Sequence, residues 1–290
     1  MDNFWEQERL LIGVATLFYG VAFLFGFVKL IRGRRYARWI LYALILVGLV
    51  FHTFGLYQRG LETEGVPLRN PFEFLQFITW SIVFLYLLVG PPERINLLGF
   101  FAAGMASLLS LVALLIPQWD YAHAPGVFRE NPWIEMHALL ALFSYGVFAV
   151  LTLVSAMYLI QNYGLLYKRS QSLFSFLPSI NLLSRMGERL LAIGVVVLTL
   201  AIVLGWVNQL IHAESILSFK ILTTSFVWAG YLALFILRRK NKLIANQFAC
   251  ACMVLFVFAL CTLIPVTQKI DARRSSNAVP FQSETEGHAE

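Results

Sequence analysis

Two histidines lie within apolar stretches of this 290-residue chain, and their type and position suit them to chemistry. His52 lies in LVGLVFHTFGLYQRG and His137 in NPWIEMHALLALFSYG. Ionisable side chains are costly in hydrocarbon and by default mark a site, and neutral imidazole is the commonest metal ligand among side chains. Two such groups that enter one leaflet from separate helices could bind a metal or a haem iron between them.

The composition indicates which elements must position these histidines. The chain is 59% hydrophobic and only 13% charged, whereas a soluble domain is about a quarter charged and under half apolar. Apolar stretches near the ~20 residues that a membrane-spanning helix needs occur at 10–31, 39–57, 74–89, 95–116, 133–160, 190–211, 217–237 and 243–265. The sequence therefore predicts an all-α, polytopic integral membrane helix bundle of about eight transmembrane helices.

The net charge of +6 reflects membrane topology rather than a nucleic-acid partner. Basic residues gather in alternate loops, and the loops between them hold few. The positive-inside rule makes the basic loops cytoplasmic and places both chain termini outside. The basic side contains Lys29, Arg32, Arg34, Arg35, Arg38, Arg94, Lys168, Arg169, Arg185, Arg189, Arg238, Arg239, Lys240 and Lys242.

The chain reads as one transmembrane domain, residues 1–268, followed by a polar tail, 269–290, that we expect to be disordered. The three cysteines form no C-x-x-C pair, and no phosphate loop or Ser/His/Asp set is visible. We therefore do not expect an enzyme that acts on its own.

Each histidine has two interpretations. Gly48 and Gly55 flank His52 at i−4 and i+3, where small residues let another backbone or a flat ligand approach closely; the alternative is a packed helix interface. His137 follows the helix start Asn131-Pro132 and should lie roughly one turn inside the outer surface. The alternative there is an interfacial histidine that reaches water.

Further candidates lie on the side poor in positive charge. Arg59 and Arg69 could pair with propionate or phosphate oxygens, or with Glu62, Glu64 or lipid head groups. Trp133 fits an aromatic belt, or a stacking surface for a porphyrin.

Two motifs resemble landmarks of the cytochrome c assembly family of CcsA/ResC and HemX-like proteins. The segment HTFGLYQRG…GVPLRNPFEFLQFITW is similar to its second-to-third span region, with the pattern P-L-x-N-x-(Y/F)-E-x-L-x-F-x-x-W. Trp133, His137, Ser144 and Tyr145 match its W-x-x-x-H-x-x-x-x-x-x-S-Y landmark. The similarity runs from about residue 39 to residue 237.

The resemblance implies a haem-handling protein of cytochrome c biogenesis in the bacterial inner membrane, a multi-pass protein. In this family, histidines near the outer face are axial ligands to haem delivered for attachment to apocytochrome c. His52 and His137 would then ligate a non-covalent haem b, and an apocytochrome c chaperone subunit of the same system would be a partner.

One departure keeps other readings open. The family's tryptophan-rich loop, W-G-x-Y-W-x-W-D-P-K-E, is replaced here by LGWVNQLIHAESILSFK. His212 lies in this shortened segment and is a further haem-ligand candidate, although a solvated helix end explains it equally. The HemX-like branch lacks the loop, which favours a non-catalytic membrane adaptor or regulator of the haem pathway. A small-solute transporter is the second alternative, but matching Gly/Pro interruptions in two halves are not found.

Overall fold

Long α-helices make up nearly all of the structure. The computed structural model describes residues 2–32, 38–62, 65–89, 96–120, 132–166, 177–212 and 219–277. These ranges contain eight helices of 19 to 35 residues and no strand. The helices are α1 (Asp2–Ile31), α2 (Arg38–Glu62), α3 (Pro71–Val89), α4 (Asn96–Leu115), α5 (Pro132–Leu166), α7 (Ile180–His212), α8 (Phe219–Arg239) and α9 (Ala245–Asn277), with a short 3₁₀ turn η1 (Pro117–Trp119) after α4.

These helices confirm the predicted polytopic membrane bundle. Within the described ranges, six of them are long and apolar enough to cross a membrane: α1 to α5 and α7. The other two are α8, with 21 residues, and α9, whose apolar part is Ala245–Cys261. Each of the eight helices contains or overlaps one of the eight predicted stretches.

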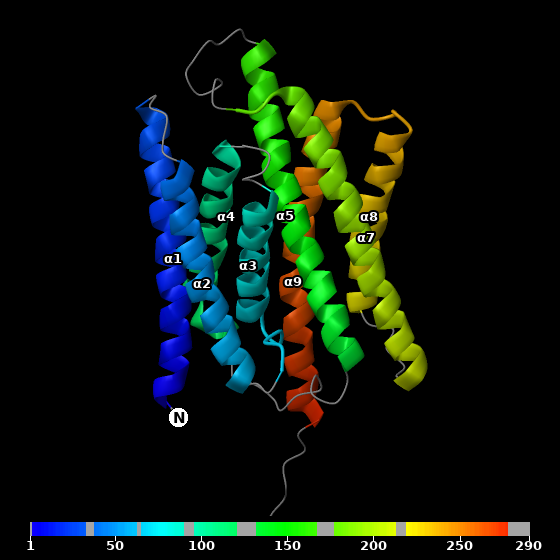
Figure 1. Cartoon of the computed structure of the whole chain (residues 1–290). Coiled ribbons are helices and arrows are strands. Elements are labelled where there is room, and N and C mark those ends of the chain that lie inside the picture. Colours follow the sequence, from blue (N-terminus) through cyan, green and yellow to red (C-terminus); the bar gives the residue numbers. More distant parts are fainter. Residues whose placement is uncertain are drawn as a thin grey trace, which may run out of the picture.

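The helices stand side by side in one bundle (Figure 1). On one side α1 packs against α2 and α4, and on the other α7 packs against α5 and α8. Helix α5 joins the two sides, because it contacts α3 and α4 as well as α7 and α9. The buried core runs through the bundle from Tyr19 on α1 to Tyr231 on α8.

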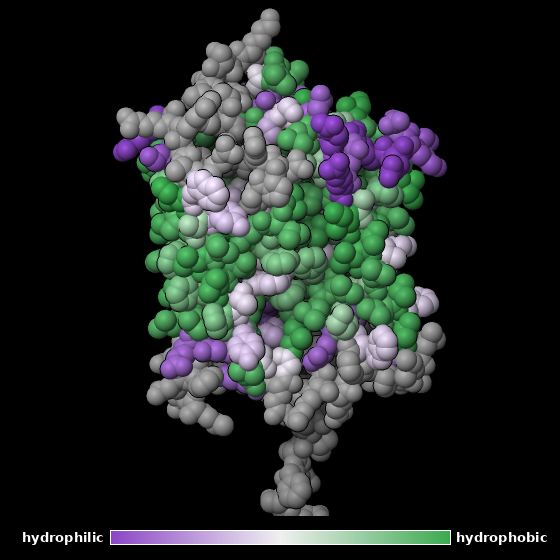
Figure 2. All heavy atoms as spheres, in the orientation of Figure 1, coloured by the Kyte–Doolittle hydropathy of each residue, from purple (hydrophilic) through white to green (hydrophobic). Residues whose placement is uncertain are grey.

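The surface carries a broad apolar band with hydrophilic residues towards both ends (Figure 2). Large apolar side chains are more than half exposed on several helices, as for Leu17 on α1, Val196 on α7 and Val254 on α9. A continuous apolar belt of this kind would be unfavourable in water, whereas lipid tails solvate it. The band accounts for the high hydrophobic content of the chain.

Most of the helices extend beyond the apolar stretches that predicted them. α2 continues to Glu62, α7 begins at Ile180 rather than near 190, and α9 continues to Asn277, into the segment predicted as a disordered tail. At the start of α7, Leu183 and Met186 are buried while Arg185 and Glu188 face outward. An amphipathic first turn can therefore continue the helix into the membrane interface, where hydropathy alone ends the span.

Both ends of the described chain lie at the same end of the bundle, where α1 begins and α9 ends (Figure 1). The last turn of α8, with Arg238 and Arg239, and the following Lys240 belong to the opposite end. We therefore predict that both termini face away from the cytoplasm. A reporter active only in the cytoplasm should be silent at the C-terminus and active when inserted after Asn241. A strong signal from the C-terminal fusion would contradict this topology.

Candidate functional site

His52 lies inside the α1–α2 interface. Its side chain is fully buried, and its Nδ1 lies 3.3 Å from the hydroxyl of Tyr19 on α1. Gly48, one turn earlier, makes room for that contact, because a Cβ there would lie 2.6 Å from the Tyr19 ring. The other ring nitrogen, Nε2, is buried and has no hydrogen-bond partner in the described structure. The small-residue stripe thus admits a helix, and one buried imidazole nitrogen is left without a hydrogen-bond partner among the described residues.

His137 is fixed by α7. Its Nδ1 lies 2.6 Å from the backbone oxygen of Ala201. A carbonyl oxygen can only accept, so Nδ1 carries the hydrogen and donates it. In the neutral ring Nε2 then holds the lone pair. Gly205, one turn beyond Ala201, lets the ring approach α7 closely, because a Cβ there would lie 2.8 Å from the His137 ring.

The two imidazoles are hydrogen-bonded to different helices. His52 pairs with α1 and His137 with α7, and these helices lie on opposite sides of the bundle (Figure 1). His52 is ten residues before the end of α2 at Glu62, about 15 Å along the helix, while His137 is five residues after the start of α5, about 8 Å. The described contacts therefore give the two rings separate surroundings at different depths.

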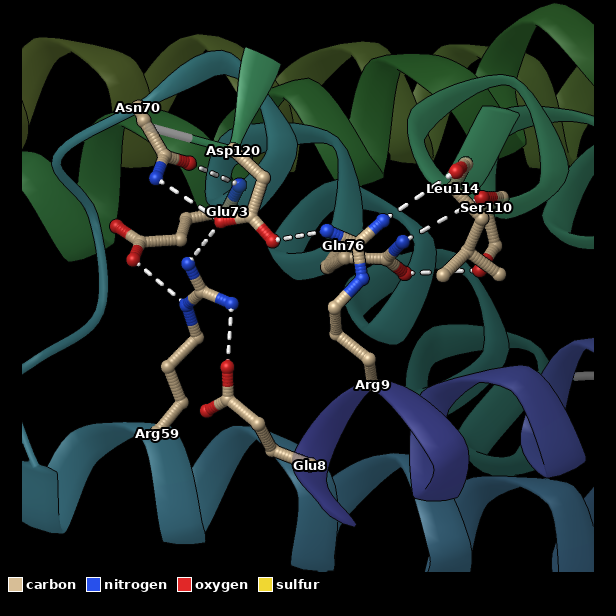
Figure 3. A network of polar contacts seen from close by, with 9 residues as sticks. All are labelled: Glu8, Arg9, Arg59, Asn70, Glu73, Gln76, Ser110, Leu114 and Asp120. Carbon is tan, nitrogen blue, oxygen red and sulfur yellow. Dashed lines mark hydrogen bonds and ion pairs between the residues drawn. The ribbon is translucent and has the colours of Figure 1, made fainter. Parts of the chain in front are cut away.

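A buried ion-pair network surrounds Arg59 (Figure 3). Its Nη1 donates to Glu8 at 2.7 Å and its Nε donates to Glu73 at 2.7 Å. Nη2 donates to Asp120, and the guanidinium also lies 4.9 Å from the centre of the Phe72 ring. The side chains of Arg59, Glu8 and Glu73 are fully buried. All three guanidinium nitrogens thus donate to carboxylates, and these are Glu8, Glu73 and Asp120.

The network gathers residues from four parts of the chain at one end of the bundle. Glu8 begins the first span, Arg59 lies near the end of α2, Glu73 opens α3 and Asp120 follows η1. Arg9 adds a second cation, with its Nη1 2.9 Å from Asp120 Oδ2. Three carboxylates therefore face two guanidiniums, and Glu8 Oε2 is buried with no hydrogen-bond partner in the described residues.

The segment LRNPFE supplies the local geometry of Glu73. Asn70 caps α3, because its Oδ1 accepts from the backbone N–H of Glu73 at 2.9 Å, and Pro71 occupies the first helical position. Glu73 Oε2 accepts from the backbone N–H of Arg69 at 2.6 Å, while Oε1 receives Arg59. One carboxylate thus orders both the helix start and the ion-pair network.

A hydrogen-bond chain continues from this end into the span region. Ser110 Oγ donates to Gln76 Oε1 at 2.9 Å and lies 2.6 Å from Thr16 Oγ1. Gln76 also donates to the backbone oxygen of Ser110 at 3.4 Å. These contacts join α3, α4 and α1, and Figure 3 shows Gln76 and Ser110 beside the charged network.

The remaining predicted site residues have separate locations. Arg69 precedes α3, and its backbone N–H binds Glu73. Trp133 lies at the start of α5 with its side chain 49% exposed. His212 ends α7, and its side chain lies outside the described residues. Within those residues, no group of three or more His, Cys, Asp or Glu side chains gathers as a metal site.

Glu8 and Asp120 are members of the ion-pair network that the sequence reasoning did not select. Glu8 precedes the predicted first span, and Asp120 follows the fourth, so neither belonged to an apolar stretch. The available signal was topological: residues 8, 59, 73 and 120 all lie near span ends that belong to one membrane side if the spans alternate.

The fold and this network define the class: a multi-pass membrane helix bundle with a buried charge cluster at one end of its spans. Residues 68–270 match the family model described as cytochrome C assembly protein, so the chain belongs to the cytochrome c assembly family. The matched region contains Glu73 and His137, and it begins after His52 and Arg59.

Relatives of this chain include proteins named HemX and CcsA. Protein HemX of Brevibacillus brevis is 27% identical over 78% of this chain and 83% of its own length. Protein HemX of Bacillus subtilis strain 168 is 22% identical over 82% of this chain and 88% of its own. The cytochrome c biogenesis protein CcsA of Mesostigma viride is 28% identical, but the match spans 43% of this chain and only 40% of that protein.

Proposed function

We propose that this protein handles haem during cytochrome c assembly in the bacterial inner membrane. The family match supports the pathway, and the hydrogen bond from His137 Nδ1 to the Ala201 carbonyl carries the haem assignment. Metal-ligating histidines usually donate their other ring N–H to a carbonyl or carboxylate, which fixes the tautomer. His137 meets that condition and keeps Nε2 for iron.

His52 also fits an axial ligand. Its Nδ1 is occupied by Tyr19, and its buried Nε2 has no partner in the described structure. A buried polar atom without a partner costs roughly 1–3 kcal/mol, which an iron–nitrogen bond would offset. In this proposal His52 and His137 would hold a non-covalent haem b, and the whole haem would be passed on for attachment to apocytochrome c. Because the two rings contact α1 and α7 at different depths, ligation of one haem by both would require the two sides of the bundle to move relative to one another.

The test is the absorbance of the full chain purified in detergent after expression with ample haem. We expect a low-spin Soret band that sharpens on reduction, as bis-imidazole ligation produces. An apocytochrome c chaperone subunit should co-purify when it is co-expressed. A protein that stays colourless even after addition of hemin would overturn the haem assignment.

A second candidate function is a non-catalytic membrane adaptor or regulator of the haem pathway. The observation that favours it is coverage: the match to HemX of Brevibacillus brevis spans most of both proteins, whereas the match to CcsA of Mesostigma viride spans under half of each. A colourless protein whose deletion still lowers the cytochrome c content of its host would support this role.

Gly205 offers a test of the His137 geometry that leaves both histidines in place. In Gly205→Ala, the new Cβ would lie 2.8 Å from the ring and displace it from Ala201. We expect haem affinity to fall about tenfold or more, as for other losses of a metal-orienting contact. Titration of the apoprotein with hemin measures this.

Gly194→Ala is the matched control, since its Cβ would lie 2.4 Å from the Phe148 ring on the same helix pair but away from His137. It should cost stability while leaving haem affinity per folded protein unchanged. Equal losses of affinity in the two variants would mean that general α5–α7 packing, not the His137 contact, is responsible.

A further inference from the structure

A basic cavity lies at the end of the bundle opposite the Arg59 network. It has a volume of about 390 Å³ and lies between the start of α7 and the end of α8. Figure 2 shows hydrophilic residues gathered at this end, directly above the apolar band. The lining consists of Arg185, Glu188, Arg189, Leu191, Ala192, Phe235, Arg238, Arg239 and Asn241.

Four arginines face a single glutamate in this lining. Glu188 is committed to Arg238, with its Oε1 2.9 Å from Nε and 2.8 Å from Nη2. Arg238 also donates to Ser184 Oγ and to the backbone oxygen of Leu243, both at 2.9 Å. This arginine therefore has three partners, and it pairs with the one carboxylate among the lining residues.

The other three arginines have no carboxylate partner among the described residues: Arg185, Arg189 and Arg239. The guanidinium carbon of Arg239 lies 5.6 Å from the centre of the Phe235 ring, which places this cation against the cavity wall. Three guanidiniums that line one space and have no carboxylate partner of their own suit an anion, because their forked donors match phosphate and carboxylate oxygens.

The turn after α8 fixes this arrangement. The backbone N–H of Lys242 donates to the Leu237 oxygen at 3.0 Å, and that of Asn241 to the Arg238 oxygen at 3.1 Å. Asn241 has a φ of 54°, a left-handed conformation that asparagine tolerates better than most residues. The chain reverses into α9 here and presents Arg238 and Arg239 towards α7.

The surroundings identify the kind of anion. Leu191, Ala192 and Phe235 form the apolar part of the lining. Beside them, Ile193 and Ile236 are 50% and 41% exposed on the lipid-facing surface. A ligand here would place its anionic group among the arginines and its apolar part along these side chains. A free inorganic anion would contact only the arginines and not the apolar side chains.

We propose that this cavity binds the phosphate group of an anionic phospholipid in the basic-side leaflet. Basic pockets between transmembrane helices are suited to such head groups. The positive-inside rule alone accounts for arginines at this end, but it requires neither a cavity nor an arginine held by three partners.

Native mass spectrometry of the detergent-purified full chain tests this, with phosphatidylglycerol and phosphatidylcholine of identical acyl chains as probes. The wild type should retain phosphatidylglycerol in clear preference to phosphatidylcholine. The triple variant Arg185→Gln, Arg189→Gln, Arg239→Gln should lose at least about tenfold in phosphatidylglycerol affinity, because each guanidinium donates charge-assisted hydrogen bonds. Glu188 and Arg238 are left intact so that the cavity keeps its frame.

The matched control neutralises three exposed basic residues at the same end that do not line the cavity, Arg32→Gln, Lys240→Gln and Lys242→Gln. It should bind phosphatidylglycerol within about twofold of the wild type, well inside one factor of ten. An equal loss in both triple variants would overturn the site in favour of general surface charge. Inorganic phosphate should compete weakly; if it protects the protein from thermal unfolding as well as phosphatidylglycerol does, the lipid source is wrong.

Discussion

Replacing Arg59 with alanine should destabilise the folded protein by roughly 3–5 kcal/mol, the usual cost of leaving a buried ion pair without one partner. The change would leave Glu8, Glu73 and Asp120 close together without the guanidinium that neutralises them. Arg9 reaches only Asp120, so it cannot replace Arg59 at the other two carboxylates. Thermal or denaturant unfolding in detergent, followed by circular dichroism, measures the loss.

Two further variants separate charge from geometry. Arg59→Lys keeps the charge but presents a single ammonium in place of three separately directed nitrogens, so it should recover only part of the stability. Arg9→Ala should cost far less, because its side chain is 32% exposed and water screens the pair with Asp120. If Arg59→Ala unfolds no more readily than Arg9→Ala, the network does not stabilise the fold.

The helices were predictable because membrane spans require long apolar stretches, and each stretch became a helix. The residues at which the helices end were harder to predict. At residues 57–62 and 180–189 the sequence turns polar, which ends a hydropathy segment but not a helix. Polar side chains there are compatible both with the membrane interface and with a continuing helix. Composition alone therefore does not reveal where the helix ends.

The partners of Arg59 in the charge network could not be predicted from the sequence alone. Arg59 was selected for its type and its location on the side poor in positive charge, and that location is consistent with the structure. Its partners Glu8, Glu73 and Asp120 come from helix ends 51, 14 and 61 residues away. Alternating spans bring such ends to one side, but the rotation of each helix decides which charges meet. That rotation follows from side-chain packing across the whole bundle.

The same limit applies to His52. The flanking glycines predicted a close approach, and the structure fills that space with Tyr19 and Ile12 of α1. The sequence could not choose between a flat ligand and a neighbouring helix, because glycine admits either. The structure adds one observation that the sequence could not provide. Nε2 of His52 is buried and has no hydrogen-bond partner within the described part of the chain.

His137→Ala should have the largest effect on the proposed haem complement. The His137 ring would supply Nε2 to the iron, and its Nδ1 donates a hydrogen bond to Ala201. Alanine removes both nitrogens. With one axial ligand gone, iron becomes five-coordinate or is released, so the low-spin Soret band should be lost or converted to a high-spin form. His52→Ala should also remove the low-spin band if its Nε2 is the second ligand, as the proposal states. Absorbance and magnetic circular dichroism of the purified variants, scaled to folded protein, give the result.

Tyr231→Phe is the control, because it removes a buried hydroxyl without a partner in the described residues and lies on α8. It should leave the spectrum unchanged. An unaltered spectrum in His137→Ala would exclude this residue as a ligand. Loss in His137→Ala with none in His52→Ala would exclude the shared ligation.

The two rings are hydrogen-bonded to α1 and α7, so a haem that needs both of them also depends on the distance between those two helices. Bis-imidazole ligation would therefore couple haem binding to the spacing between the two sides of the bundle, which α5 joins.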